Sequence, residues 1–150
     1  MKLKLIFVIL LAVLAAPTAF AQKQTNKKAT AAKAEQTTPR RIVYDMAEGD
    51  TARHSGLMRQ LNNIKRGWPD AQVEIVVHGK ALNLLVTDKT TQAAAIKSLQ
   101  EKGVSFVACE NTMRVQKVEK NQLLPGVTTV PMGIGEIITK QDEGWGYIKF

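Results

Sequence analysis

The sequence contains a single cysteine and two histidines in 150 residues. One cysteine excludes an intrachain disulfide and a CxxC redox pair. With so few cysteines and histidines, no recognisable metal-ligand set is present either, so we expect no metal and no cofactor. The motifs GxSxG, HExxH and the P-loop are absent as well, which removes common hydrolase, zinc-protease and nucleotide-binding patterns. The lone thiol of Cys109 is therefore the first candidate for chemistry.

Positive charge is in excess, but it is concentrated at the beginning of the chain. The net charge is +8, and residues 22–41 hold six Lys or Arg against one Glu. From Ile42 onward, 13 Lys or Arg stand against 12 Asp or Glu. A nearly neutral domain lacks the basic footprint of a nucleic-acid-binding protein. We therefore expect no nucleic-acid partner.

The N-terminus has the pattern of a cleavable export signal. Two lysines in the first four residues precede an apolar run over residues 5–16, and the sequence AFA at residues 19–21 fits the small-x-small rule for signal peptidase. The apolar run is shorter than the ~20 residues that span a bilayer. We expect residues 1–21 to be a signal peptide that is cut between Ala21 and Gln22, which makes the mature protein periplasmic or secreted.

Residues 22–40 contain no large apolar side chain. Such a segment cannot bury enough surface to offset the entropy of ordering, so it is predicted to be a basic, disordered tail. Two interpretations are open: a solvated linker, or an arm that touches an anionic membrane or cell-wall polymer. Contact with a membrane is expected only through this tail or the signal.

Residues 41–150 are long enough for one domain with one core. Short apolar runs alternate with segments in which apolar residues recur at helical spacing. Strands are predicted at residues 41–46, 72–78, 104–109, 127–130 and 144–150. Continuous apolar strands separated by helices indicate an α/β fold with a mainly parallel, roughly five-stranded sheet covered on both faces. Ligands gather at the C-terminal ends of such strands, where Asp45, His78, Cys109 and residues 131–135 fall.

Cys109 is the last residue of the third predicted strand, and Glu110-Asn111-Thr112 follow it. A helix is predicted over residues 112–118, with Asn111 or Thr112 as its cap. Its N-terminal N–H groups would lie beside the sulfur and lower the thiol pKa, whereas the adjacent Glu110 would raise it. Free cysteine is also among the residues most often buried as a small hydrophobe. Position alone leaves a reactive thiol and a packed side chain equally open.

His78 ends the second predicted strand and precedes Gly79. Beside a neighbouring third strand, His78 could act as base or charge partner of the Cys109 thiolate. The alternative is that His78 orders the turn at Gly79 through a backbone hydrogen bond. Gly133 and Gly135 resemble a fragment of an anion-binding loop, but close helix–strand packing explains them better. Three aromatic residues near the C-terminus predict core packing or a subunit contact: Trp145, Tyr147 and Phe150.

Several short motifs occur in an order that resembles the DsrE/DsrF-like family. They are His78-Gly79 after a Val-rich strand, GVSFVACENTM at residues 103–113, VPMG at 130–133 and QDEGWGYI at 141–148. The resemblance covers residues 41–150, the DsrE-like domain. It implies a flavodoxin-like three-layer sandwich that assembles as a homo-oligomer, either a trimer or a hexamer. It also implies a cysteine that carries a persulfide between proteins, and the matching position is Cys109.

Two functions from different classes are therefore expected as alternatives. In the first, the chain is an exported sulfur carrier or sulfurtransferase, in which Cys109 accepts a sulfur atom as a persulfide and passes it to a thiol-bearing protein partner. The residues expected to bind and stabilise the anionic sulfur are His78, Gly79, Asn111, Thr112 and Gly133. In the second, the domain is a non-catalytic ligand-binding or oligomeric assembly module, and Cys109 only packs.

Overall fold

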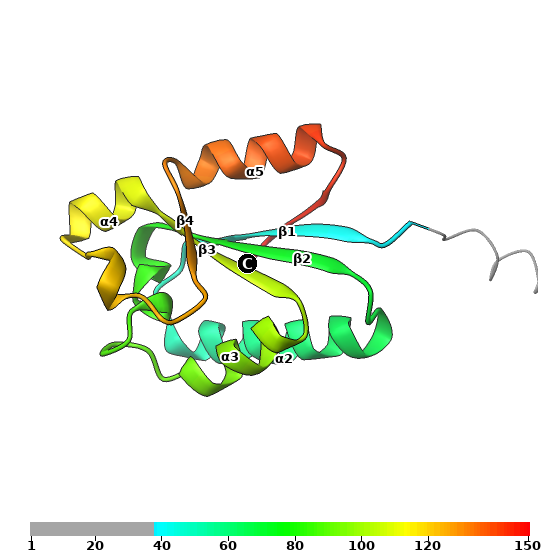
Figure 1. Ribbon diagram of the computed structural model, residues 1–150, viewed down its shortest axis with the longest axis horizontal. Helices are drawn as coiled ribbons and strands as arrows, with labels where there is room; N and C mark the ends of the chain where they lie inside the picture. Colours follow the sequence, from blue (N-terminus) through cyan, green and yellow to red (C-terminus); the bar gives the residue numbers. More distant parts are fainter. Residues whose placement is uncertain (1–37) are drawn as a thin grey trace, which may run out of the picture. The chain divides into compact units, whose positions relative to one another are not determined.

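The computed structural model describes residues 38–150, so the predicted signal peptide and most of the predicted tail lie outside the described residues. Five parallel strands form one sheet in the order β4-β3-β2-β1-β5 (Figure 1). The strands are β1 (Arg41–Met46), β2 (Gln72–Val77), β3 (Val104–Cys109), β4 (Thr128–Val130) and β5 (Gly146–Lys149). The predicted parallel α/β sheet, with its flavodoxin-like three-layer arrangement, is confirmed.

Helices connect the strands and cover both faces of the sheet. They are α2 (Thr51–Gly67), the 3-10 helix η1 (Gly79–Leu85), α3 (Ala93–Glu101), α4 (Glu110–Gln116), the 3-10 helix η2 (Lys120–Gln122) and α5 (Gly133–Asp142). The chain moves from β1 to β4 in one direction across the sheet and then returns to place β5 beside β1. Because parallel crossovers are right-handed, this reversal puts α5 on the face opposite α2 and α3, as Figure 1 shows. No helix of residues 38–150 is long and apolar enough to cross a membrane.

The larger core lies between the sheet and the α2/α3 layer. Helix α2 begins at Asp50, whose side chain accepts a hydrogen bond of 2.8 Å from the backbone N–H of Ala52. Its Leu57 and Leu61 are fully buried and meet Tyr44, Ile75 and Phe106 of the three central strands in one cluster. Each such leucine contributes roughly 1.5–3 kcal/mol through removal of apolar surface from water. Packing of this layer therefore stabilises the sheet whose strands carry the residues at their C-terminal ends.

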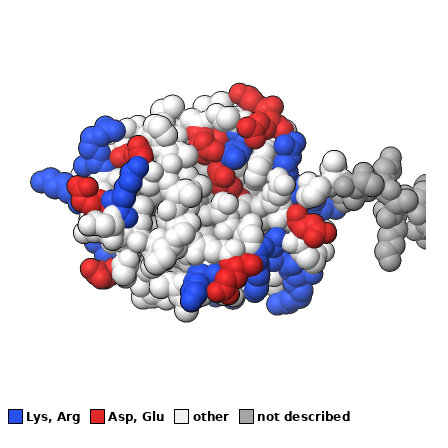
Figure 2. Space-filling model, viewed as in Figure 1, with Lys and Arg blue, Asp and Glu red and all other residues white. Residues whose placement is uncertain are grey.

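The opposite face of the sheet has a smaller core and carries charge. Val43, Val76 and Ile137 form a separate buried cluster beneath α5. Beside it, Glu74 of β2 is 9% exposed and forms an ion pair of 3.3 Å with Lys140 of α5. The packing of Ile137 on Val43 and Val76 and the largely buried Lys140–Glu74 ion pair thus attach α5 to the sheet. The surface in Figure 2 carries both signs of charge around its rim and little charge at its centre, as expected for a nearly neutral domain.

Candidate thiol site

Cys109 lies at the C-terminal end of β3, next to the end of β2. Strands β2 and β3 are paired in parallel, and the last aligned residues are Val77 and Ala108. One step further along both strands are His78 and Cys109. The sequence required adjacent strands for His78 to act on Cys109, and the two strands are adjacent.

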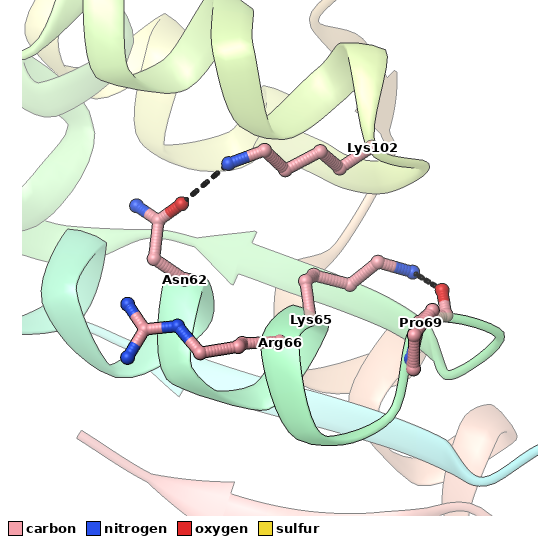
Figure 3. A pocket seen from close by; sticks show the side chains of 5 residues that line it. All are labelled: Asn62, Lys65, Arg66, Pro69 and Lys102. Atoms are coloured by element: carbon pink, nitrogen blue, oxygen red, sulfur yellow. Dashed lines mark hydrogen bonds between the residues drawn. The ribbon is translucent and has the colours of Figure 1, made fainter.

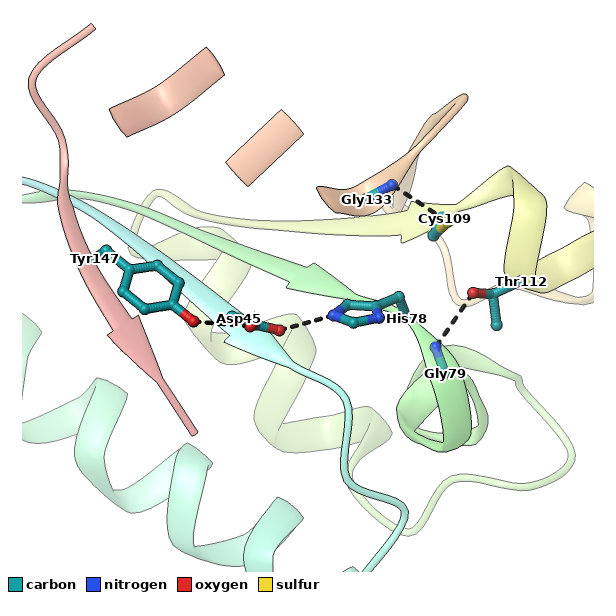
Figure 4. Close-up of polar contacts among 7 residues, drawn as sticks. All are labelled: Asp45, His78, Gly79, Cys109, Thr112, Gly133 and Tyr147. Carbon is teal, nitrogen blue, oxygen red and sulfur yellow. Dashed lines mark hydrogen bonds and ion pairs between the residues drawn. The ribbon is translucent and has the colours of Figure 1, made fainter. Parts of the chain in front are cut away.

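Backbone N–H groups from two helix starts converge on the sulfur atom. The N–H of Gly133, the first residue of α5, donates a hydrogen bond of 3.2 Å to Cys109 Sγ (Figure 4). Burial acts to raise the pKa of the Cys109 thiol. The N–H groups of Gly133, Thr112 and Asn111, with the Thr112 hydroxyl, outweigh burial and hold this pKa below its ordinary value. The site therefore favours an anionic sulfur despite its low exposure.

A side chain at the position of Gly133 would be crowded by the ends of two strands. A Cβ there would lie 3.2 Å from Cβ of Cys109, 3.2 Å from Cγ1 of Val76 and 3.5 Å from Cβ of His78. The start of α5 thus sits directly on the carboxyl ends of β2 and β3, which brings its N–H to the sulfur. The weak glycine pattern in the sequence marks this close helix–strand contact.

Helix α4 begins two residues earlier than the sequence predicted. It starts at Glu110, and Cys109 itself occupies the capping position, with no side-chain cap hydrogen bond. The side chain of Asn111 instead accepts a hydrogen bond of 2.7 Å from Arg114. The prediction of Asn111 or Thr112 as cap is wrong because the chain leaves the extended conformation immediately after the strand. The earlier start places the N–H groups of Asn111 and Thr112 in the first turn, next to the sulfur.

Glu110 does not oppose the thiolate as the sequence suggested. Its carboxylate pairs with Lys120 at 2.8 Å and accepts a hydrogen bond of 2.7 Å from Thr129. Hydrogen bonds from Lys120 and Thr129 lower the pKa of Glu110 itself. The groups that set the pKa of Cys109 are N–H and O–H donors rather than Glu110. The adjacent negative charge is thus directed away from the sulfur.

Gly79 ties the end of β2 to helix α4. Its N–H donates to Thr112 Oγ1 at 3.2 Å, and its carbonyl accepts from Gln116 Nε2 at 2.7 Å. Gly79 has a φ of 56°, a left-handed conformation that most side chains disfavour, which explains the glycine. Thr112 therefore contacts both the turn after His78 and the thiol. Of the predicted residues, Thr112, Asn111 and Gly133 contact Cys109, and Gly79 is linked to it through Thr112.

His78 faces a carboxylate rather than the sulfur. Its Nε2 lies 2.7 Å from Oδ1 of Asp45, and Oδ2 of Asp45 accepts a hydrogen bond of 2.8 Å from the hydroxyl of Tyr147 (Figure 4). Among the described residues, no hydrogen bond joins His78 to Cys109. The ring is therefore fixed in orientation by Asp45, with its other nitrogen uncommitted. A role for His78 toward the thiolate stays a prediction.

The sequence did not assign a role to Asp45 or Tyr147. The sequence pattern puts Asp45 at the C-terminal end of the first predicted strand and Tyr147 among the aromatic residues near the C-terminus. The structure joins them because β5 pairs with β1, with Val43 aligned to Tyr147 and Asp45 aligned to Lys149. This is the position where strand order reverses, at which doubly wound sheets bind ligands. An acidic residue one position before the end of an apolar strand was the available signal.

The site combines a low-pKa thiol with limited access. Cys109 is 5% exposed, and the turn that leads into α5 lies over it, with the carbonyl of Pro131 accepting a hydrogen bond of 3.3 Å from the N–H of Asn111. No group of three or more His, Cys, Asp or Glu side chains in residues 38–150 is arranged to hold a metal ion. The arrangement can stabilise a sulfur anion and exclude bulk water from it.

Known proteins share this sequence pattern and fold. The pattern of the DsrE/DsrF-like family matches residues 8–150, whereas a comparison with curated proteins finds no match. The protein of unknown function MTH1491 from Methanobacterium thermoautotrophicum is 32% identical, with a TM-score of 0.71 over 74% of this chain and 99% of that one. The ychN protein from E. coli is 9% identical, with a TM-score of 0.58 over 75% and 100%, and shares the fold alone. The chain belongs to the DsrE/DsrF-like family.

Proposed function

We propose that the chain is an exported sulfur carrier that holds a persulfide on Cys109. The observation that carries this proposal is the Cys109 sulfur itself, which accepts the N–H of Gly133 and whose pKa is lowered by donors from two helix starts. A neutral thiol accepts hydrogen bonds only weakly, so donors directed at the sulfur stabilise its anionic form more than its neutral form. Membership of the DsrE/DsrF-like family supports the same role.

The transfer is a pair of thiol–disulfide-type exchanges without net oxidation. The Cys109 thiolate attacks the outer sulfur of a donor persulfide, the donor S–S bond breaks, and the donor leaves as a thiolate. Cys109 then carries the outer sulfur as an anionic persulfide. An acceptor thiolate attacks that outer sulfur in turn and releases the Cys109 thiolate. The N–H groups around the site stabilise the anion in both resting forms.

Access to the sulfur limits the donors that the site accepts. The turn of residues 131–133 covers Cys109. Within residues 38–150, the backbone hydrogen bond from Asn111 to Pro131 and the hydrogen bond from Gly133 to the sulfur hold this turn in place on the thiol side. A small polysulfide can reach the thiol with a small movement of this turn. A protein donor or acceptor requires a larger opening, and a persulfide-bearing or thiol-bearing protein is the expected partner.

Export and self-association are part of the same proposal. The signal pattern of residues 1–21 supports a periplasmic or secreted location. A homo-oligomer is supported by exposed apolar side chains on α5 and on the turn before it, because large apolar side chains are enriched at interfaces. They are Met132, Ile134 and Ile138. Gel filtration with light scattering measures its size, and a trimer or hexamer is expected.

The direct test is the mass of the protein after exposure to a sulfur donor. Mature protein is incubated with a small polysulfide, freed of excess donor and analysed intact under thiol-blocking conditions. We expect the mass of one additional sulfur atom, located on Cys109 by peptide mapping. The added sulfur should leave when a small thiol is supplied as acceptor. Protein that never gains this mass while Cys109 is reduced would contradict the proposal.

Replacing Thr112 with valine should make the thiol less reactive at neutral pH. The hydroxyl of Thr112 helps to lower the pKa of Cys109, so its loss moves this pKa upward and reduces the thiolate fraction. Loss of about 1 kcal/mol of anion stabilisation corresponds to about fivefold slower iodoacetamide labelling at pH 7. The measurement is the labelling rate against pH, in which the midpoint should move to higher pH.

The control for this change is Thr128→Val, the same substitution at an exposed threonine of strand β4. In residues 38–150 the Thr128 hydroxyl makes no hydrogen bond. The pH profile of Cys109 labelling in Thr128→Val should therefore match that of the wild type. Thermal unfolding of both variants checks the fold, since Thr112 also accepts the N–H of Gly79. Equal pH profiles for wild type and Thr112→Val would show that the hydroxyl does not act on the sulfur.

A further inference from the structure

A basic hollow lies at the end of the sheet opposite the thiol. It has a volume of about 490 Å³ and is lined by Asn62, Lys65, Arg66, Pro69 and Lys102. Lys102 immediately precedes the turn into β3, and Pro69 precedes β2. Because all strands are parallel, this is the amino edge of the sheet, and Cys109 is at the carboxyl edge. The hollow is therefore separate from the sulfur site.

The lining is cationic without a compensating acid. Lys65 and Arg66 come from the last turn of α2, Lys102 caps the end of α3, and no Asp or Glu lines the hollow. Asp70 and Glu101 are adjacent to lining residues in the sequence but do not line it. Three positive side chains from two helices thus surround one concave space, which favours an anion.

The basic residues of the hollow differ in how many hydrogen bonds they already make. Lys65 Nζ donates to the backbone carbonyls of Pro69 and Ala71, the latter at 2.9 Å. Lys102 Nζ donates to Asn62 Oδ1 at 2.7 Å, and its other two N–H donors have no partner among the described residues. Within residues 38–150, the guanidinium of Arg66 makes no hydrogen bond or ion pair. Figure 3 shows Arg66 and the ammonium of Lys102 on the Asn62 side of the hollow, and Lys65 reaching Pro69 on the other.

Stabilisation of the C-terminus of α2 explains only part of this arrangement. Basic side chains in a last helical turn interact favourably with the helix dipole and the terminal carbonyls. Lys65 has that role, because its ammonium binds carbonyls after the helix end. Lys102 belongs to a different helix and is held over the hollow by Asn62, whose own Nδ2 donates to Met58 O at 3.0 Å. The dipoles of α2 and α3 favour a basic side chain at each of these helix ends, but within residues 38–150 neither the Lys102 ammonium nor the Arg66 guanidinium donates to a terminal carbonyl.

We propose that this hollow binds a phosphate group through Arg66 and Lys102. A guanidinium presents a planar pair of donors that matches two phosphate oxygens, and an ammonium adds a point charge on a third. A phosphomonoester carries close to two negative charges at pH 7, which matches the two positive charges of Arg66 and Lys102 better than a single carboxylate does. The phosphate belongs either to a soluble phosphoester or to a lipid headgroup. This inference does not rest on the proposed sulfur chemistry.

The test compares two probes on the full mature chain. Glycerol phosphate is titrated by calorimetry, and vesicles of phosphatidylglycerol in phosphatidylcholine are used in a sedimentation assay at fixed salt. We expect saturable binding of at least one probe. Binding of glycerol phosphate identifies a soluble phosphoester site, and binding of vesicles alone identifies a lipid headgroup site. Saturable binding of neither probe would overturn the proposal.

Matched variants show whether the hollow is responsible. Arg66→Gln/Lys102→Gln should weaken binding about tenfold or more, because two charge-assisted contacts are lost. The control Lys89→Gln/Lys97→Gln removes the same charge from exposed lysines elsewhere and should bind within about twofold of the wild type. Equal weakening in both double variants would show non-specific charge attraction and overturn the site. Thermal unfolding checks the fold, and polysulfide loading of Cys109 should be unchanged in every variant.

Discussion

A Cys109→Ser variant is expected to lose all polysulfide-derived sulfur and all iodoacetamide labelling while keeping its fold. Serine cannot form a persulfide, and the chain has no other cysteine to replace it. The serine hydroxyl can still accept the N–H of Gly133, which donates to the sulfur at 3.2 Å in the wild type. The stability cost should therefore be only about 1 kcal/mol. Intact mass, labelling and chemical unfolding together measure these three outcomes.

A relocated thiol provides the control for this loss. Val115 lies on α4 and is 82% exposed, so Cys109→Ser/Val115→Cys carries one thiol in ordinary solvent. This thiol should titrate near the usual cysteine range of about 8.5 and retain no stable persulfide once excess donor and a small thiol are applied. If the relocated thiol holds sulfur as well as Cys109 does, the donors around Cys109 have no role in carriage. Full retention of every cellular function in Cys109→Ser would favour the binding or assembly module instead.

The sheet and most site residues could be predicted because they depend on short local patterns. Apolar runs such as residues 104–109 identify the strands, and parallel order follows from the helices between them. The parallel sheet then places His78 and Cys109 at one edge, which the pairing of Val77 with Ala108 confirms. The structure places Gly79 in a turn and Gly133 at a close helix–strand contact. A binding role for either glycine stays a prediction.

The remaining site residues depend on strand order, which the sequence does not contain. Tyr147 meets Asp45 only because β5 returns to pair with β1. The orientation of His78 toward Asp45, rather than toward the sulfur, is set by that same neighbourhood. The earlier start of α4 was missed because Glu110-Asn111-Thr112 offers several polar caps, and the chain uses none of them. Side-chain direction at the ends of elements thus required the three-dimensional structure.

The strongest expected effect on stability comes from Lys140→Met, which should cost about 3 kcal/mol of unfolding free energy at pH 8. Lys140 Nζ lies 3.3 Å from Glu74 and 3.4 Å from Glu136, and Glu74 is 9% exposed with one carboxylate oxygen lacking any hydrogen-bond partner within residues 38–150. Removing one member of a buried pair leaves the other charge uncompensated, at a cost of about 3–5 kcal/mol. The lower value applies because both groups keep some exposure to solvent.

The cost of Lys140→Met should shrink as the pH falls from 8 to 5. Burial already raises the pKa of Glu74 in the folded protein, although Lys140 acts to lower it. Without Lys140 this pKa rises further, so the folded state binds a proton more tightly than the unfolded state does. A group with a raised folded pKa gives up stability as the pH rises through that pKa and regains it on acidification. Urea unfolding at both pH values measures the difference.

Two further variants separate the charge effect from the loss of a side chain. Glu74→Gln/Lys140→Met removes both charges and should recover most of the stability at pH 8, with little dependence on pH. Lys149→Met replaces an exposed lysine of β5 and should stay within about 0.5 kcal/mol of the wild type. If Lys140→Met loses equal stability at pH 8 and pH 5, the effect comes from the lost contact with Trp145, whose ring centroid lies 4.6 Å from Lys140 Nζ.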